Sequence, residues 1–521
     1  MSANQPESGA KRRFGLQRRD IVITLVLLLT VGVVVLIIPV VRISLAVPGS
    51  FPDGPAKLGE LIERFQPSDA GPDAPDAYDL LLQALERSVA LDEEIRDLME
   101  QEMASRFPDP GEAAYLDMES IEDPTIPHIN TRDLSADEAK NLQREYNKLF
   151  SAYAMEYLDA LRESGVYDLL DQMAVAPRAV PDVGTAHPMA VRMLDSLGHS
   201  RALARALKAQ FLLSVRRGDP IAAARAHEHV LAIARTLSYD PTLISRLVVY
   251  ALLALADGMV QDAFASESLD ADTIRALLNN EQRRRSLAPH AMMLEGERLL
   301  TLDTIAITHS DDGAGSGYAL PTEMSLLTGS AFAANAPSPR NIPGLGLPRK
   351  RATVQLANEY FDACVARASL APRDRVDDAD WKRLLERIDD SKLLSAILST
   401  IGTAQQFDDA ATCRSAGMRL RLAIELYRAR HAEPPPSLDA LLPTYLDAIP
   451  QDPFAHDASF IYRPLPEPDE HGRVYLLYSV GADGQDDACA ELPSNTRHQA
   501  LMPGHAGADY AFTPASPDEA P

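Results

Sequence analysis

The 521-residue chain has few cysteines, few aromatic residues and no excess of positive charge. Three cysteines, Cys364, Cys413 and Cys489, are too few for a disulfide framework. Cys364 and Cys413 could pair in an oxidising compartment, or all three could be buried free thiols. Aromatic residues make up 6% of the chain, which favours a helical core rich in Ala and Leu over a β-sandwich. The net charge of −25 argues against a nucleic-acid partner, because phosphates require a basic surface.

The chain also lacks the short signatures of common enzyme classes. It has no Walker loop, no dinucleotide-binding glycine fingerprint, no G-x-S-x-G elbow and no H-E-x-x-H sequence. His227-Glu228-His229 places two imidazoles two residues apart, and on a helix such side chains point apart. We therefore predict helix-surface histidines rather than joint metal ligands. Asp377-Asp378 and Asp389-Asp390 are predicted to be solvated helix ends. These observations favour a protein that is not an enzyme, and no catalytic residue is assigned.

One long apolar run lies near the N-terminus. Residues 21–41 are uncharged and rich in Val, Leu and Ile, and their number matches the ~20 residues that cross a bilayer as a helix. Five basic residues precede the run, and Arg42 alone follows it closely. The positive-inside rule then predicts a basic cytoplasmic tail at residues 1–20 and a single-pass protein of the inner membrane. The bulk of the chain is expected in the periplasm or outside the cell.

Three alternatives stay open for this segment. Ser44-Leu45-Ala46 would suit signal-peptide cleavage, although the apolar run is longer than the core of a usual signal peptide. Arg18-Arg19-Asp20 before the run suggests a twin-arginine export signal, although the rest of that motif is missing. Gly15, with the acidic Asp20 five residues later and Pro39 late in the run, resembles a degraded prepilin N-terminus. An uncleaved anchor is favoured over all three.

Helical periodicity dominates the middle of the chain. Residues 47–75 are rich in Pro, Gly and Asp and are predicted to be a linker, whereas residues 76–309 are predicted to be a helical domain. Helices are expected over residues 201–216 and 221–237, separated by Gly218-Asp219-Pro220, and a third after Asp240-Pro241. The apolar residues of the third helix are Leu243, Ile244, Leu247, Val248, Ala251, Leu252 and Leu255. Small residues facing bulky ones resemble a tetratricopeptide-like unit, and a plain helical bundle stays open.

A segment without helical periodicity interrupts these helices. Residues 310–350 are rich in Gly, Pro and Ser and are predicted to be a flexible loop, which could serve as a linker, a lid or a disordered insert. Residues 351–430 are predicted to continue the helical domain. Trp381, the only tryptophan, is predicted to be a packing anchor rather than a site.

The C-terminal part carries the most specific pattern. Pro434-Pro-Pro436 ends a helix, because proline cannot continue it. After Asp452-Pro453-Phe454, strands are predicted over residues 460–463 and 473–480, where side-chain character alternates with period two. Residues 431–490 are therefore predicted to form a small α+β hairpin module. Residues 491–521 are predicted to be a disordered tail. The expected fold is mostly α, with an N-terminal transmembrane helix, a helical bundle or tetratricopeptide-like middle, and this module.

The order of motifs in this module resembles the C-terminal part of the major pseudopilin of bacterial type II secretion. The motifs are P-x-S-L-x-x-L, P-x-D-P-F, F-I-Y and Y-S-V-G-A-D-G. In pseudopilins the loop after the second strand binds calcium. The resemblance therefore implies that Asp483, Asp486 and Asp487 hold calcium, and Gly481 and Gly484 would permit the sharp turn. An acidic surface turn without a metal stays open.

Two functions follow from these observations. The first is a membrane-anchored extracytoplasmic interaction or scaffold protein of a bacterial envelope, linked to type II secretion or pilus-like machinery. Such a protein would bind a protein partner on its helical domain. The second is an anchored or secreted enzyme with a dispersed site in the helical core. The missing enzyme signatures favour the first.

Overall fold

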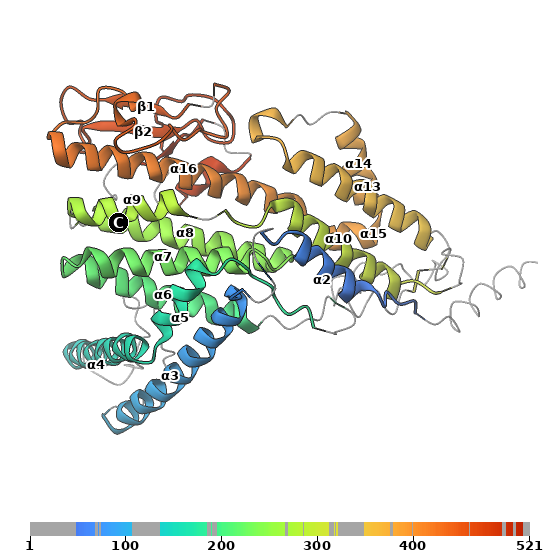
Figure 1. The fold of residues 1–521 in the computed structure, drawn as a ribbon, viewed down its shortest axis with the longest axis horizontal. Helices are drawn as coiled ribbons and strands as arrows, with labels where there is room; N and C mark the ends of the chain where they lie inside the picture. The colour runs from blue at the N-terminus through green and yellow to red at the C-terminus, as the bar shows by residue number, and fades with distance from the viewer. Residues whose placement is uncertain are drawn as a thin grey trace, which may run out of the picture. The chain divides into compact units, whose positions relative to one another are not determined.

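The computed structural model shows a mostly helical protein with a small antiparallel sheet (Figure 1). The structure describes residues 48–67, 71, 74–106, 136–184, 189, 195–265, 269–284, 286–311, 317, 319–320, 349–375, 379–398, 400–457, 459–491, 496–503 and 507–513. The predicted cytoplasmic tail and membrane segment, residues 1–20 and 21–41, lie outside the described residues. The chain divides into two compact units, Met1–Phe51 with Leu302–Gln355, and Pro52–Thr301 with Leu356–Pro521.

The described elements are mainly long helices. The α-helices are α2 (Gly54–Arg64), α3 (Ala77–Arg106), α4 (Ala136–Glu163), α5 (Val166–Val175), α6 (Asp195–Arg216), α7 (Pro220–Leu237), α8 (Leu243–Ala265), α9 (Ala271–Arg283), α10 (His290–Ile307), α13 (Lys350–Ala368), α14 (Ala379–Asp390), α15 (Lys392–Leu398) and α16 (Ile401–His431). Short 3₁₀ helices are η3 (Pro372–Asp374), η4 (Leu438–Leu441) and η5 (Arg497–Leu501). The strands are β1 (Ile461–Pro464), β2 (Tyr475–Ser479) and β3 (Tyr510–Ala511).

The predicted linker over residues 47–75 contains a helix, α2, and this part of the prediction is wrong. Leu58, Leu61 and Ile62 are buried at helical spacing, which gives the segment an apolar side to pack. Pro55 lies in the first turn, where its missing N–H costs no hydrogen bond. The Pro and Gly content of the segment concealed this short amphipathic stretch.

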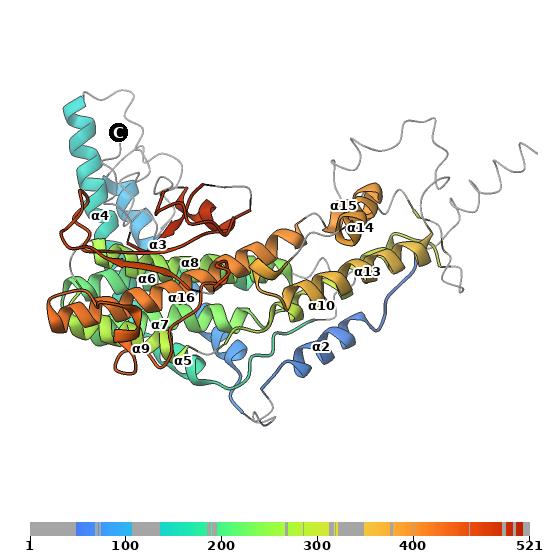
Figure 2. The same cartoon turned by 90° about the horizontal axis from the view of Figure 1, so that it is seen from above.

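Helices α6, α7, α8 and α9 pack on one another, and α16 contacts α8 and α9 (Figures 1 and 2). The predicted breaks between them are confirmed. The Asp219 carboxylate caps α7 by accepting a hydrogen bond from the N–H of Ala222 at 3.0 Å. Asp270 caps α9 through the N–H of Thr273 at 2.7 Å. Both caps satisfy backbone donors that have no partner within their own helix.

Helix α8 is long and apolar enough to cross a membrane by length and composition, and over its most apolar stretch 61% of the residues are buried within the protein. Its contacts with α6, α7 and α16 make it a core helix of the larger unit. Its buried face differs from a simple apolar stripe. Ile244 and Leu247 are 60% and 39% exposed, whereas Arg246 is 2% exposed.

In the smaller unit, a few described residues are joined by backbone hydrogen bonds. The N–H of Gly49 donates to the carbonyl of His309 at 2.9 Å, and the N–H of Leu320 donates to the carbonyl of Thr308 at 2.8 Å. The beginning of the predicted 310–350 loop therefore folds back on the end of α10. Most of that loop lies outside the described residues.

The C-terminal region, residues 432–513, packs on α16. Helix α16 ends at His431, and Ala432 follows in the left-handed conformation with φ 63°. Residues 351–430, predicted to continue the helical domain, contain α14, α15 and most of α13 and α16 in their described part. The predicted hairpin is confirmed, because β1 pairs antiparallel with β2 in the register Ile461 with Tyr478.

A third strand corrects the prediction of a disordered tail from residue 491. Strand β3 pairs with β2, with Ser479 opposite Tyr510, and η5 precedes it. Phe512 follows β3 and is 1% exposed. A Cβ on Gly417 of α16 would lie 2.1 Å from the ring of Phe512. The glycine thus lets the end of the chain pack directly on α16. Residues 514–521 lie outside the described residues.

Candidate binding groove and buried charge network

A groove forms where α13, α14, α15 and α16 meet the C-terminal region. It encloses a cavity of about 570 Å³. Its apolar lining residues are Leu294, Tyr360, Pro372, Trp381, Leu385, Ile388, Leu398, Ile401, Phe454, Ala482, Leu501 and Pro503. We refer to this site as the α13–α16 groove. Its size and mostly apolar lining are typical of a binding site.

The only tryptophan lies in the wall of this groove. The ring of Trp381 stacks on Tyr360, with 6.1 Å between the ring centroids and 18° between the ring planes. The guanidinium of Arg367 lies 4.5 Å from the centroid of the Trp381 ring, in a cation–π arrangement. Trp381 packs against its neighbours, as predicted, and it also lines the cavity. The groove thus presents an aromatic face beside a positive charge.

The cysteines do not supply reactive groups to the groove. Burial raises the pKa of the Cys364 thiol to about 11, so this lining residue is protonated at neutral pH and is a poor nucleophile. Cys364, Cys413 and Cys489 are free thiols, and the first two are buried. Of the two alternatives for the cysteines, the structure has the free thiols.

The ion pair of Arg375 and Asp409 lines the groove. Both terminal nitrogens of Arg375 bind the Asp409 carboxylate, with 2.9 Å between Nη2 and Oδ1. Gln405 donates to the same carboxylate at 3.2 Å, and Arg375 also donates to the carbonyl of Leu370 at 2.7 Å. Burial raises the pKa of Asp409, although Arg375 opposes this effect. The pair is saturated by these contacts, so it shapes the groove rather than offering a free charge.

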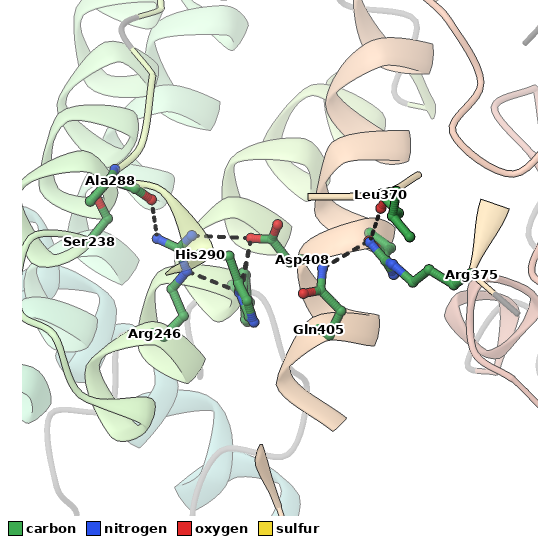
Figure 3. Close-up of polar contacts among 10 residues, drawn as sticks. Ser238, Arg246, Ala288, His290, Leu370, Arg375, Gln405 and Asp408 are labelled. Carbon is green, nitrogen blue, oxygen red and sulfur yellow. Dashed lines mark hydrogen bonds and ion pairs between the residues drawn. The ribbon is translucent and has the colours of Figure 1, made fainter. Parts of the chain in front are cut away.

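A second polar cluster connects α8, the start of α10 and α16 (Figure 3). Arg246 donates from Nη1 to the carbonyl of Ala288 at 2.9 Å, and its Nη2 lies 3.2 Å from Asp408 Oδ1. The Tyr250 hydroxyl donates to Asp408 at 3.0 Å and lies 3.2 Å from His290 Nδ1. Burial alone would raise the pKa of Asp408, but His290, Arg246 and Tyr250 outweigh it and lower this pKa to about 2. Arg246 therefore has an ionised partner.

Two further buried carboxylates lie between α8, α9 and α16. Asp257 lies 3.2 Å from Nε of Arg414, and burial raises the pKa of Asp257 to about 6 although Arg414 opposes it. Glu281 is 4% exposed, accepts a hydrogen bond from Ser415 at 3.2 Å and lies 3.6 Å from Arg284. These contacts place two further groups of buried charges inside the helical part of the larger unit.

The prediction that His227 and His229 are surface histidines is wrong. Each is 1% exposed. His229 Nε2 lies 2.7 Å from Asp171 of α5, whereas His227 Nε2 lies 3.8 Å from Glu281 of α9. Helix α7 contacts α5, α6, α8 and α9, so little of its surface reaches solvent. The two rings face different neighbours, as expected for an i, i+2 pair, and do not converge on one metal.

The predicted calcium residues lie in the loop after β2, where two of them bind their own surroundings. Asp483 Oδ2 accepts a hydrogen bond from the N–H of Gly507 at 3.0 Å. Asp486 Oδ1 accepts a hydrogen bond from the Tyr478 hydroxyl at 2.9 Å, and Oδ2 lies 2.9 Å from Arg463. These carboxylates hold the loop in shape and neutralise an arginine.

Asp487 lies beside a fourth acid, Asp509, which sequence reasoning missed because it falls in the predicted tail. Asp509 is 0% exposed and accepts hydrogen bonds from the N–H groups of Asp487 and Cys489, and burial raises its pKa to about 6. Asp487 Oδ2 is buried and has no hydrogen-bond partner among the described residues. Those residues contain no group of three or more His, Cys, Asp or Glu side chains placed to hold a metal ion. The calcium site at Asp483, Asp486 and Asp487 stays a prediction.

The acidic pairs are surface groups where they are described. Asp389 and Asp390 are exposed at the end of α14, as predicted, and Asp377-Asp378 lies outside the described residues.

The cluster of Arg246, His290 and Asp408 corresponds to no sequence motif, because its members are far apart in the chain. Its one sequence signal is Arg246 among the apolar residues of the first turns of α8. Comparison of the chain with models of known families, with curated proteins and with solved structures yields no match.

Proposed function

We propose that the chain is a membrane-anchored interaction protein of a bacterial envelope, which binds a segment of a partner protein in the α13–α16 groove. Residues 21–41 would be its anchor in the inner membrane, and the bulk of the chain would lie on the periplasmic side. The observation that carries the proposal is the arrangement of Trp381, Tyr360 and Arg367 in the wall of the groove.

The chemistry of the groove suits a protein segment. Trp, Tyr and Arg contribute most of the binding energy in many protein interfaces, and the centres of such interfaces are apolar. Trp381 already contacts Tyr360 and Arg367, so little side-chain entropy would be lost on binding. An aliphatic or aromatic side chain would pack between Trp381 and Leu385.

A second surface for protein contacts lies on α8. Ile244 and Leu247 are 60% and 39% exposed, and Ala251 is exposed one turn further along. These three residues share one face of the helix at three- and four-residue spacing. Successive packed helices with such a face are the layout of a tetratricopeptide-like unit, which is the finer fold we propose for α6–α9.

The C-terminal region supports a link to type II secretion or pilus-like machinery. The hairpin packs on α16, and the Tyr475 hydroxyl donates to Glu425 of that helix at 2.7 Å. A helix followed by a hairpin on its side is the order of the pseudopilin resemblance. Here α16 has that place, and residues 42–400 separate it from the predicted anchor. Calcium at Asp483, Asp486 and Asp487 belongs to the same proposal.

An anchored or secreted enzyme is the second candidate, and His290 favours it. This residue is 7% exposed, and its Nδ1 lies 3.8 Å from Asp408 Oδ1 and 3.2 Å from the Tyr250 hydroxyl. Its Nε2 is buried and has no hydrogen-bond partner in the described part of the chain. A histidine oriented through one nitrogen can exchange protons through the other. Because the sequence has none of the common enzyme signatures, we prefer the interaction protein.

The test is purification of the full-length protein from its own membranes, followed by quantitative mass spectrometry of what accompanies it. Trp381→Ala should reduce a specific partner by about tenfold or more, as expected when an interface anchor is truncated. Leu370→Ala is the matched control, because Leu370 is 44% exposed and does not line the groove. Arg367→Ala, which leaves the apolar packing of Trp381 and Tyr360 in place, should give a smaller loss. Unchanged recovery with both groove variants would contradict the proposal.

A further inference from the structure

A second cavity, of about 350 Å³, lies between α8, α9 and α16. Its charged lining residues are Arg246, Glu281, Arg284, Asp408 and Arg419. Three guanidinium groups therefore face two carboxylates, which leaves one positive charge in excess. This excess is opposite in sign to the net charge of the whole chain, which is −25.

Two of the three arginines have anionic partners. Arg246 is paired with Asp408, at 3.2 Å. Arg284 lies 3.6 Å from Glu281 and donates to the Ser415 hydroxyl at 3.0 Å. The two carboxylates of the cavity are thus committed to these two guanidinium groups. The remaining cation is Arg419.

Arg419 is a partly buried cation without a partner. Its guanidinium makes no hydrogen bond or ion pair with any of the described residues, and its Nε is buried. Burial lowers the pKa of Arg419, and Glu281 only partly opposes that effect. An unpaired charge in such a place is unfavourable until a counter-ion binds. His290, which also lines the cavity, has a buried Nε2 that lacks a partner within the described ranges.

We propose that this cavity binds a small molecule through an anionic group, either a carboxylate or a phosphate, held by Arg419 with Arg284 beside it. The planar guanidinium presents two N–H groups in the geometry that matches two oxygens of such an anion. The volume is at the small end of the range of ligand pockets. The exposed hydroxyls of Ser286 and Thr412 lie at the lining and can donate to the rest of the ligand. This inference does not depend on the α13–α16 groove, because His290 is the one residue named here that lines both cavities.

The experiment is calorimetric titration of the full-length protein in a zwitterionic detergent. The two probes are inorganic phosphate and succinate, each at constant ionic strength set with sodium chloride. Wild type should bind at least one probe saturably, and Arg419→Gln should weaken that binding by about tenfold or more, because one charged hydrogen-bond donor is lost. Arg421→Gln is the matched control, because Arg421 lies on the same helix but over the ring of Phe264. It should bind as wild type does.

Each outcome decides the proposal. Binding of phosphate alone assigns a phosphate ligand, and binding of succinate alone assigns a carboxylate ligand. The absence of saturable binding of either probe would overturn the inference, as would equal binding by wild type and Arg419→Gln. Without any anion, Arg419→Gln should melt no lower than wild type. A clearly lower melting temperature would show that Arg419 is a structural partner of Glu281 and would also overturn it.

Discussion

The helical part of the larger unit and the C-terminal region use buried and partly buried carboxylates in different ways. Between the helices, carboxylates are paired with arginines that come from distant parts of the chain. Asp257 of α8 pairs with Arg414 of α16, and Asp408 of α16 pairs with Arg246 of α8. These pairs join two helices that contact each other. Each partner would be a costly unpaired charge if the other were removed.

In the C-terminal region, the buried carboxylates bind backbone N–H groups instead. Asp452 and Asp509 are both 0% exposed. Asp452 accepts a hydrogen bond from the N–H of Phe454 at 2.9 Å, and Asp509 accepts one from the N–H of Cys489 at 2.7 Å. Such bonds fix loop geometry locally, and an uncharged oxygen can replace part of them. The same residue type therefore joins helices in one region and shapes loops in the other.

The prediction with the largest expected effect compares a carboxylate paired with an arginine with a carboxylate bound to backbone N–H groups. Asp408→Asn should lower the unfolding free energy by about 3 kcal/mol, because it leaves the 2%-exposed Arg246 without a counter-charge. Asp509→Asn should lower it by only about 1 kcal/mol, because the amide oxygen can still accept one N–H. Urea unfolding of the full chain in detergent measures both values. Equal losses of unfolding free energy in the two variants would contradict this difference between the two regions.

The pH dependence of the unfolding free energy should sharpen the comparison between the two regions. The folded pKa of Asp257 is raised to about 6 by burial, so the folded state holds a proton that the unfolded chain releases near pH 4. The stability that this proton gives is present below about pH 4 and is lost as the pH rises to about 6. Relative to Asp257→Asn, wild type should lose about 2–3 kcal/mol over that range. A constant difference between the two proteins from pH 4 to pH 7 would contradict the raised pKa.

Packing between the two regions can be tested at Gly417. Gly417→Ala should cost about 2 kcal/mol, because the ring of Phe512 must move to admit a methyl group. Gly402→Ala is the control on the same helix. Its nearest neighbour outside the helix would be the Tyr360 hydroxyl at 3.9 Å, so it should be neutral or slightly stabilising. Thermal melts would show the contrast, and equal melting temperatures would mean that Phe512 does not pack on α16.

The smallest effect concerns calcium. If Asp483, Asp486 and Asp487 hold the ion, calcium at ten times its Kd should raise the unfolding free energy by about 1.4 kcal/mol. Asp487→Asn should abolish the rise, whereas Asp439→Asn, outside that loop, should keep it. A titration of the full chain that shows no heat and no change in melting temperature would end the calcium prediction.

Local patterns predicted the local parts of this structure. Gly218-Asp219-Pro220 predicted the end of α6 and the start of α7, and the alternation around Tyr478 predicted β2. Which face of a helix is buried was harder to predict from the sequence. Helix α8 has apolar residues on every side, and in the structure Ile244 is exposed whereas Arg246 is buried. Strand β3 is two residues long and is defined only by its pairing with β2.

The buried charge network and both cavities depend on contacts between distant residues. Arg246 and Asp408 are 162 positions apart, and no spacing rule relates them. Trp381 could be recognised as a packing residue, but its place in a groove depends on how α13, α14 and α16 meet the C-terminal region. A single sequence does not contain that information in a local pattern.

The most direct test of partner binding in the α13–α16 groove is site-specific photo-crosslinking in the native membrane. A photoreactive residue at Leu385, which lines the groove, should form a crosslink to one discrete protein partner, and Trp381→Ala should remove it. The same residue at Glu386, the exposed neighbour on α14, should give little of that product. Equal crosslinking from both positions, or a Leu385 crosslink that survives Trp381→Ala, would contradict a partner bound in the groove.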